Sequence, residues 1–258
     1  MSENILKLEH VSKSFARTDA ADVTNALQDV SLEVRTGEFI SIVGASGCGK
    51  STILRLIAGL IAPTTGTLTL DGRPITGPAP ERGMVFQKPT LFPWLTVEQN
   101  VSFSLRMMHN TEGMDEKVDR LVKMAGLEEF RTSYPHQLSG GMAQRVALIR
   151  TMINNPPVFL LDEPLGALDA FTRMNMQDEL LGMWGESRHM MLMVTHDVDE
   201  ALYMGTRVVI MAPRPGRVRE DLQIELEYPR NRTSSKFMEY RKHVLEMLDF
   251  GRAEDEAE

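Results

Sequence analysis

The sequence predicts an α/β protein whose core is a parallel sheet covered by helices on both faces. Short apolar segments typical of buried strands recur along the chain, separated by segments with helical spacing. One of these strands runs into a glycine-rich loop at Gly44–Ser51 that opens a helix. From Lys88 to about Ser133 the strand patterns stop. This stretch predicts a helical subdomain inserted into the sheet protein.

The N-terminal strands differ from the later ones because they alternate apolar and polar residues. Leu6–Val11 and Leu27–Val34 both show this period of two, which is typical of half-buried antiparallel strands. Leu68–Leu70, followed by Asp71-Gly72, indicates a further strand and a tight turn. Phe39–Val43 is nearly continuous in apolar character, as buried parallel strands are. We therefore expect an N-terminal antiparallel β subdomain beside a parallel core.

The other elements follow from the same patterns. The segment Arg17–Asn25 is polar and lacks a strand pattern, so we expect a loop there, one that could flank a bound nucleotide. An apolar stripe predicts a C-terminal helix, and the acidic ending Glu254–Glu258 indicates a disordered tail. Helices are expected over Ser51–Ala58, Val97–Met107 and Glu116–Ala125, strands over Met84–Phe86, Val158–Leu161, Met190–Val194 and Arg207–Met211, and the stripe comprises Phe237, Tyr240, Val244, Leu245 and Leu248.

Composition limits the possible partners and compartment. The chain has 258 residues, 42% of them hydrophobic and 25% charged, as in ordinary globular domains. Its net charge of -8 argues against nucleic acid as the main partner, because phosphate-backbone binding needs a basic face. The single cysteine, Cys48, excludes an internal disulfide and suits a reducing compartment. Without an apolar run of ~18 residues or a secretory signal, we expect a cytosolic protein that reaches membranes through a protein partner.

These patterns predict one domain with an insertion. We expect residues 1–87 and 156–230 to form the core, residues 88–155 the helical subdomain, and residues 231–258 the C-terminal helix and acidic tail.

Gly44–Ser51 fits the pattern of a phosphate-binding loop, G-x-x-x-x-G-K-[ST]. Its glycines let backbone N–H groups converge on phosphate oxygens, and the following helix adds the positive end of its dipole. Lys50 is expected to reach the β- and γ-phosphates and Ser51 to coordinate Mg²⁺. Cys48 is expected to fill space within the loop. Since a helix N-terminus can lower a thiol pKa, Cys48 is also a candidate for ready alkylation.

Two carboxylates, Asp162 and Glu163, end the apolar segment that begins at Phe159. Ligands of open α/β sheets bind at the carboxyl ends of strands. Asp162 is expected to orient the Mg²⁺ shell, and Glu163 is our candidate general base for an attacking water. A pair of helix-capping acids before Pro164 is the alternative that the dipeptide alone leaves open.

The stretch Leu138–Arg145, read Leu-Ser-Gly-Gly-Met-Ala-Gln-Arg, lies between the phosphate loop and the two carboxylates. In this order the three motifs resemble the nucleotide-binding subunit of an ATP-binding cassette (ABC) transporter, an α/β P-loop ATPase. In that family Leu-Ser-Gly-Gly closes over the ATP held by a second subunit. The resemblance therefore implies ATP hydrolysis with Mg²⁺, a homodimer formed through ATP, and separate membrane permease subunits.

The resemblance also implies roles for residues that would mean little alone. Gln87 matches a glutamine that contacts Mg²⁺ and the membrane partner, Asp169 a loop between subunits, and His196 a switch histidine at the γ-phosphate. Phe15 matches an aromatic position that stacks on adenine, with an ordinary core phenylalanine as the alternative. The implied catalytic residues are Lys50, Glu163 and His196; the implied nucleotide contacts are Phe15, Gly44, Ala45, Ser46, Gly47, Cys48, Gly49, Lys50, Ser51, Thr52, Gln87, Ser139, Gly140, Gly141 and Asp169; and the implied metal ligands are Ser51, Gln87 and Asp162.

Further stretches narrow the resemblance. Pro78–Gln87, followed by Leu91–Val97, looks like importers of the nitrate, sulfonate and taurine type, whose cargo is a small anionic or organosulfur or nitrogen solute. Ala212–Arg217 and Tyr228–Arg232 are similar to the same group. Gln87–Leu105, which contains Trp94, is expected to receive the permease, with a packed subdomain residue as the other reading of Trp94. A solute-binding protein would act indirectly. The implied location is the cytoplasmic side of the inner membrane, as a peripheral subunit.

Three other readings remain open. A soluble ABC protein could use the same ATP clamp mechanically, although such proteins usually carry long coiled-coil insertions or fused cassettes. A regulatory module without turnover is disfavoured because Glu163 and His196 are both present. An exporter subunit would have the same catalytic residues as an importer.

Overall fold

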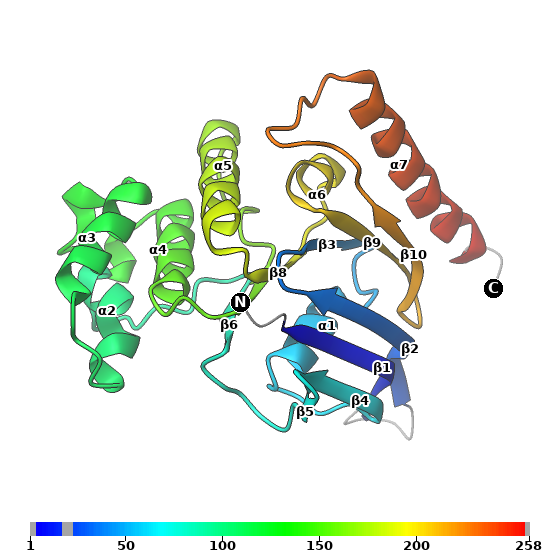
Figure 1. Cartoon of the computed structure of the whole chain (residues 1–258), viewed down its shortest axis with the longest axis horizontal. Coiled ribbons are helices and arrows are strands. Elements are labelled where there is room, and N and C mark those ends of the chain that lie inside the picture. The colour runs from blue at the N-terminus through cyan, green and yellow to red at the C-terminus, as the bar shows by residue number, and fades with distance from the viewer. Residues whose placement is uncertain (1–3, 17–22, 256–258) are drawn as a thin grey trace. The chain divides into compact units, whose positions relative to one another are not determined.

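The computed structural model describes residues 4–16 and 23–255, and these divide into two compact units (Figure 1). The first unit comprises Met1–Ala79 with Arg188–Glu258, and the second comprises Pro80–Ser187. Residues 88–155, for which we expected a helical subdomain, lie within the second unit together with two strands and a further helix.

The first unit contains the expected antiparallel sheet. Its strands are β1 (Ile5–Ala16), β2 (Val23–Arg35), β4 (Thr65–Leu70) and β5 (Arg73–Pro74), in the order β2-β1-β4-β5 (Figure 1). Leu6 and Leu8 of β1 and Val34 of β2 are buried, as the period-two pattern requires. The β4–β5 turn uses Asp71 and Gly72, both with positive φ, which suits a tight hairpin.

Strand β2 begins earlier than the sequence predicts. It starts at Val23, so Val23–Asn25 pair with β1 and are not part of a loop. The polar side chains of Thr24 and Asn25 hide this strand from a pattern based on apolar alternation. The rest of the expected loop, residues 17–22, lies outside the described residues.

The parallel core strands of the first unit are β3 (Phe39–Gly44), β8 (Met190–Val194) and β9 (Arg207–Ala212). Strand β3 pairs in parallel with both β8 and β9. All five residues of β8 are buried, which explains its unbroken apolar sequence. Strand β10 (Arg217–Gln223) pairs antiparallel with β9 and was not predicted, because none of its residues is fully buried and its apolar signal is weak.

Three helices complete the first unit: α1 (Lys50–Ile57), α6 (Val198–Met204) and α7 (Ser235–Asp255). Helix α7 confirms the predicted C-terminal helix, with Phe237 and Val244 of the apolar stripe buried. Because α7 continues to Asp255, the expected disordered tail is wrong for Glu254 and Asp255, while residues 256–258 lie outside the described residues.

The second unit combines two parallel strands with helices. Strand β6 (Arg82–Val85) pairs with β7 (Val158–Asp162), and all of β7 is buried. We expected a short buried strand over Met84–Phe86, but only Val85 of β6 is buried. Phe86 lies after the end of the strand. The helices are α2 (Val97–Met107), α3 (Met114–Met124), α4 (Gly140–Met152) and α5 (Ala170–Ser187), with short 3₁₀ turns at Glu128–Phe130 and Pro135–Gln137.

Helix α2 has the bounds that the sequence predicts, and hydrogen bonds between Thr96 and Gln99 define where it begins. Thr96 accepts a hydrogen bond from the backbone N–H of Gln99, and the Gln99 side chain accepts one from the backbone N–H of Thr96. This reciprocal capping box satisfies two backbone donors that the first turn cannot pair. Within the described ranges, no helix combines the length and apolarity that a membrane span requires.

Candidate nucleotide-binding site

The phosphate loop joins β3 to α1 in the first unit, as predicted. Gly47 and Gly49 have φ values of 79° and 91°, in the left-handed region that favours glycine. At Gly44 the reason is space: an added Cβ would lie 2.7 Å from the Cys48 Sγ and 2.9 Å from the Met211 Cβ. The loop sequence is therefore fixed by its backbone path. The exposed part of the loop consists of Ala45, Ser46 and Gly47.

The Lys50 side chain packs inside the phosphate loop and bonds its backbone. The side chain is buried, and its Nζ donates hydrogen bonds to the carbonyl oxygens of Gly44 at 2.8 Å and Ala45 at 2.9 Å. Three donors on one ammonium suit it to hold the loop and a phosphate together. Ser51 and Thr52 lie in the first turn of α1, half-buried, at the positive end of the helix dipole.

Cys48 differs from one expectation. Its side chain is fully buried inside the loop, so it fills space as predicted. Burial raises the pKa of the thiol, although the nearby Lys50 ammonium opposes that shift. Ready alkylation through a lowered pKa is therefore wrong for this loop, because the loss of solvation outweighs the influence of Lys50 on the thiol.

Phe15 lies near the end of β1, paired with Thr24 of β2. Its ring is 41% exposed, which excludes the ordinary core phenylalanine. The Lys13 Nζ lies 5.0 Å from the ring centroid. An exposed aromatic face beside a cation is suited to stacking on a nucleobase that carries phosphates.

His196 lies on the connection from β8 to α6 in the first unit, and its side chain is exposed. The residues beside it are tied down. The Thr195 hydroxyl accepts from the backbone N–H of Asp197 at 3.1 Å, and Asp197 caps α6 by accepting from the N–H of Glu200 at 3.1 Å. The histidine therefore projects from a fixed turn at the carboxyl end of a core strand.

Gln87 and Glu163 meet in the second unit. The β6–β7 register pairs Val85 with Leu161, so Gln87 and Glu163 each lie two positions past this pair. The Gln87 Nε2 donates to the Glu163 Oε2 at 2.9 Å. From the sequence, Gln87 and Glu163 have separate expected roles, and their contact was not predicted. The amide orients the carboxylate through Nε2, and its Oε1 is the atom with metal-ligand chemistry.

Asp162 and Glu163 have different surroundings. Asp162 is the buried last residue of β7, whereas Glu163 is half-buried and has a φ of 47°. A positive φ is uncommon for a residue with a side chain and is found at functional turns. The alternative of simple helix-capping acids does not fit, because the next helix, α5, begins only at Ala170 and is capped by Asp169.

The Leu-Ser-Gly-Gly turn opens α4. Ser139 caps the helix by accepting from the backbone N–H of Met142 at 3.2 Å, and Gly140 is exposed. A Cβ on Gly141 would lie 3.0 Å from the Leu168 Cδ2. The turn therefore packs against the loop that leads to Asp169, so these two predicted intersubunit motifs touch within one chain.

Asp169 has a structural role in this loop. Its Oδ1 accepts a hydrogen bond from the backbone N–H of Thr172 at 3.1 Å, which caps α5. Hydrogen bonds from Thr172 lower the pKa of the Asp169 carboxyl. The cap holds the carboxylate ionised at an exposed position.

Gln144 connects the signature helix to the Gln87 segment. Its side chain is almost completely buried, and its Nε2 donates to the carbonyl oxygen of Phe86 at 3.1 Å. Sequence analysis missed this residue, since a glutamine inside a helix carries no signal of its own. The bond ties the residue before Gln87 to the helix that begins with Leu-Ser-Gly-Gly.

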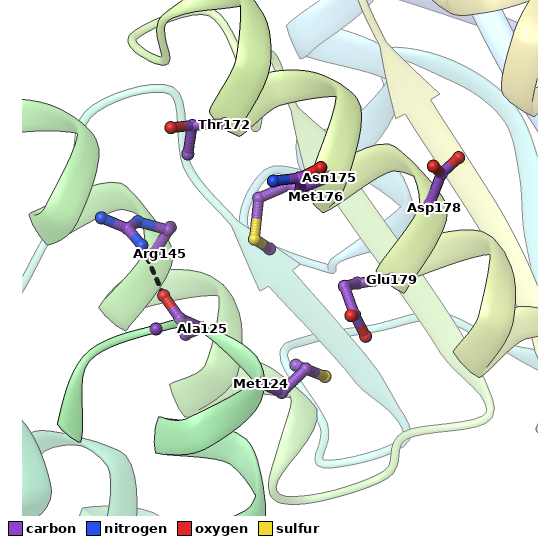
Figure 2. A pocket seen from close by; sticks show the side chains of 9 residues that line it. Met124, Ala125, Arg145, Thr172, Asn175, Met176, Asp178 and Glu179 are labelled. Atoms are coloured by element: carbon purple, nitrogen blue, oxygen red, sulfur yellow. Dashed lines mark hydrogen bonds between the residues drawn. The ribbon is translucent and has the colours of Figure 1, made fainter.

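Arg145, the last residue of the motif, borders a cavity of about 430 Å³ (Figure 2). Its Nη1 donates to the carbonyl oxygen of Ala125, which ends α3. Figure 2 shows Asn175, Asp178 and Glu179 of α5 around the same cavity. Arg145 therefore links α4 to the end of α3.

The expected permease surface surrounds Trp94. Trp94 is 69% exposed, which excludes the packed-residue reading. The Phe92 ring lies 5.7 Å from the Trp94 ring and 4.3 Å from the Phe103 ring, measured between centroids. A cavity of about 500 Å³ adjoins Phe92 and Phe103 and is also lined by Arg150.

Asn100, which sequence analysis missed, holds this loop in place. It is fully buried in α2. Its Oδ1 accepts from the backbone N–H of Phe92 at 2.9 Å, and its Nδ2 donates to the carbonyl oxygens of Phe92 at 3.2 Å and Leu95 at 3.0 Å. Arg150 adds a hydrogen bond from Nη1 to the Thr90 carbonyl oxygen at 2.7 Å. The exposed Trp94 therefore stands on a rigid loop.

Comparison with known proteins agrees with these motifs. Residues 27–166 match the family model described as ABC transporter. The chain is 48% identical to an uncharacterized ABC transporter ATP-binding protein of Methanocaldococcus jannaschii over 94% of this chain and 91% of that protein. It is 44% identical to the aliphatic sulfonates import ATP-binding protein SsuB of Bacillus subtilis, over 89% and 88% of the two chains. It is 43% identical to the taurine import ATP-binding protein TauB of Jannaschia sp., over 94% and 93%.

A solved structure is similar over most of its length. It is the dimeric structure of a post-hydrolysis state of the ATP-binding cassette MJ0796 bound to ADP and Pi. The TM-score is 0.76 at 33% sequence identity, over 85% of this chain and 99% of that one.

The chain belongs to the ABC transporter family. It is an ATP-binding, ATP-hydrolysing protein of that family, which confirms the predicted reaction and the α/β fold of ABC type, with its N-terminal antiparallel sheet and parallel core.

Proposed function

We propose that this protein is the ATPase subunit of an importer for a small sulfonate-type or related anionic solute. The observation that carries the proposal is the match over nearly the whole chain to import ATP-binding proteins for aliphatic sulfonates and taurine. The cargo binds to other chains of such a system, so its identity enters here only as a class.

The proposed reaction is in-line attack of water on the γ-phosphate of ATP. Glu163 polarises the water, and the hydrogen bond from Gln87 Nε2 keeps one carboxylate oxygen fixed. Lys50 neutralises charge that develops on the phosphates, and the exposed His196 contacts the γ-phosphate. Phe15 stacks on the adenine. The loop amides of Gly44–Ser51, with Thr52, bind the phosphates.

Mg²⁺ fits the proposed ligands by donor chemistry. Ser51, Gln87 and Asp162 offer a hydroxyl, an amide oxygen and a carboxylate, which are the hard oxygen ligands that Mg²⁺ prefers. Within the described residues no cluster of three or more His, Cys, Asp or Glu side chains could hold a metal ion. That agrees with an ion held by one carboxylate and the phosphates of its nucleotide. When bound, Mg²⁺ neutralises phosphate charge.

A homodimer would complete each ATP site. Ser139, Gly140 and Gly141 of one protomer close on the ATP held by its partner, and Asp169 lies next to the same contact. The proposal is supported by the exposure of Ser139 and Gly140 at the start of α4, and by the dimeric state of the similar cassette. The helix N-terminus supplies N–H donors for the γ-phosphate.

The membrane permease would dock on Gln87–Leu105. The proposal is supported by the exposed Trp94, the aromatic cluster beneath it and the rigid support from Asn100. A fixed aromatic residue is suited to anchor a short helix of a partner. Movement of Gln87 would then connect the permease to Glu163. The subunit would lie on the cytoplasmic side of the inner membrane, and a solute-binding protein would act through the permease.

The proposed function is tested by purifying the protein from membranes of its native cell. We expect a permease and a solute-binding protein to accompany it, and the ligand of the binding protein to be a small sulfonate or related anion. Recovery with nucleic-acid or ribosomal components, and without any membrane protein, would instead favour a soluble mechanical ATPase. Recovery with a permease and no binding protein would favour an exporter.

A further inference from the structure

The phosphate loop rests on residues that lie far from it in the sequence. In the first unit, Gly216 belongs to the turn between β9 and β10 and is buried. Its N–H donates to the Ala26 carbonyl oxygen at 3.1 Å, and its carbonyl oxygen accepts from the Gln28 N–H at 2.9 Å. These two bonds make a parallel bridge between Gly216 and Leu27 of β2.

Gly216 is glycine for a steric reason. It is not among the glycines with positive φ, so backbone freedom does not explain the residue. A Cβ at this position would lie 2.0 Å from the Cys48 carbonyl oxygen and 2.9 Å from that of Ala26. Contacts of a real Cβ essentially never fall under 3.0 Å. A methyl group would therefore displace the Cys48 carbonyl or the turn by about 1 Å.

The neighbouring Gly49 is held from the same side. A Cβ there would lie 2.5 Å from the Leu27 Cδ2 and 2.7 Å from the Ala26 carbonyl oxygen. Ala26, Leu27 and Gly216 thus form one platform under Cys48 and Gly49. Ala26 and Leu27 of the platform belong to β2, the strand whose Thr24 pairs with Phe15.

We infer that Gly216 is a positioning residue for the phosphate loop. Because it has no side chain, the backbone of Cys48 and Gly49 can lie close against the platform. The inference deepens the proposed function, on which it rests only for the identity of the ligand. A loop shifted by about 1 Å would aim its N–H groups past the phosphate oxygens, and errors of that size lower activity as much as about a hundred-fold in enzymes.

The test compares Gly216→Ala with Gly77→Ala in the full-length protein. Gly77 is the matched control, because a Cβ there meets no atom within 4 Å and its φ is not in the left-handed region. The first measurement is the Kd for ADP by calorimetry. The second is the rate at which a maleimide alkylates Cys48, the single cysteine, which is fully buried beneath the loop.

We expect Gly216→Ala to raise both the ADP Kd and the alkylation rate by at least about ten-fold, and Gly77→Ala to change neither by more than about two-fold. A weaker ADP affinity with an unchanged alkylation rate would overturn the inference, since it would indicate damage elsewhere. Unchanged ADP affinity would overturn it as well.

The test also covers two other cases, a Gly216→Ala variant that does not fold and an unmodified protein that does not bind ADP. If Gly216→Ala does not fold, Leu27→Ala tests the same platform, because it removes the side chain under Gly49 and leaves the β2 backbone intact. The same two increases are expected, and their absence overturns the inference. If the unmodified protein binds no ADP, the proposed function fails, and the alkylation rates alone decide whether the platform positions the loop.

Discussion

At the scale of single residues, the Gln87–Glu163 hydrogen bond is the most direct link between motifs that the sequence keeps 76 residues apart. The amide donor holds Oε2 of the carboxylate that we propose as the general base. A small movement of Gln87 would change the direction in which the Glu163 carboxylate points. We therefore expect the chemistry proposed for Glu163 to respond to a partner that binds the segment beginning at Gln87.

Phe15 supplies a prediction at this scale. Phe15→Ala is expected to weaken ATP binding and Phe15→Trp to preserve it, because the ring is exposed at the strand end. Base–aromatic stacking contributes roughly 1–3 kcal/mol, about five-fold to over a hundred-fold in affinity. Calorimetric titration with ATP checks this. Equal affinity in Phe15→Ala would mean that the adenine binds elsewhere.

At the scale of elements, a single buried amide fixes the loop before α2. Asn100→Leu is expected to destabilise the protein by about 2–4 kcal/mol, because it removes the side chain that pairs with the part-buried N–H of Phe92 and carbonyl oxygen of Leu95. Urea unfolding measures the change. Asn110→Leu is the control, since Asn110 is exposed and its replacement is expected to change stability by less than about 0.5 kcal/mol. Similar values for the two variants would contradict the role of Asn100.

The loop that Asn100 supports gives a second prediction for this element. Trp94→Glu or Leu95→Glu is expected to weaken membrane association and to leave Mg²⁺-ATP binding intact. Burying an unpaired carboxylate in an interface costs several kcal/mol, on the order of a hundred-fold or more in affinity. Co-sedimentation with permease-containing membranes measures it. Met238→Glu, an exposed apolar residue of α7, is the control. Undiminished association of both loop variants would exclude this surface.

At the scale of the whole molecule, the sequence predicts most of the fold and the order of the site motifs. Buried strands such as β8 and the capped helix α2 are found where the patterns indicate, because one face or both faces of these elements lie in the core. The phosphate loop follows its consensus since its glycines are required by backbone path and space.

The sequence did not predict those strands and site residues that are defined by tertiary contacts. Strand β10 and the start of β2 have little apolar alternation, and pairing with neighbouring strands defines them. Gln144 and Gly216 carry no local signal, because each acts on a segment distant in the chain. Asn100 carries none because its partners are backbone groups of the irregular loop just before α2. The lowered thiol pKa expected for Cys48 was wrong for the same reason, since burial by the packing around the loop raises that pKa.

A complementation experiment examines whether two chains share each ATP site. Ser139→Arg and Lys50→Ala are each expected to abolish ATP hydrolysis, one by blocking the Leu-Ser-Gly-Gly turn and the other by weakening phosphate binding. Mixed dimers then hold one site with both lesions and one intact site. We expect partial recovery of hydrolysis upon mixing. Activity that stays at the level of the separate variants would argue against an intact site that works alone.

The central claim is that ATP joins two copies of this chain, and sedimentation velocity of Glu163→Gln tests it most directly. This variant keeps the shape of the side chain but cannot act as a base, so it should bind Mg²⁺-ATP and hydrolyse it very slowly. We predict a monomer without nucleotide and a dimer with Mg²⁺-ATP, with the added Ser139→Arg substitution preventing that dimer. A Glu163→Gln protein that is saturated with Mg²⁺-ATP and still sediments as a monomer at high concentration would contradict the shared site.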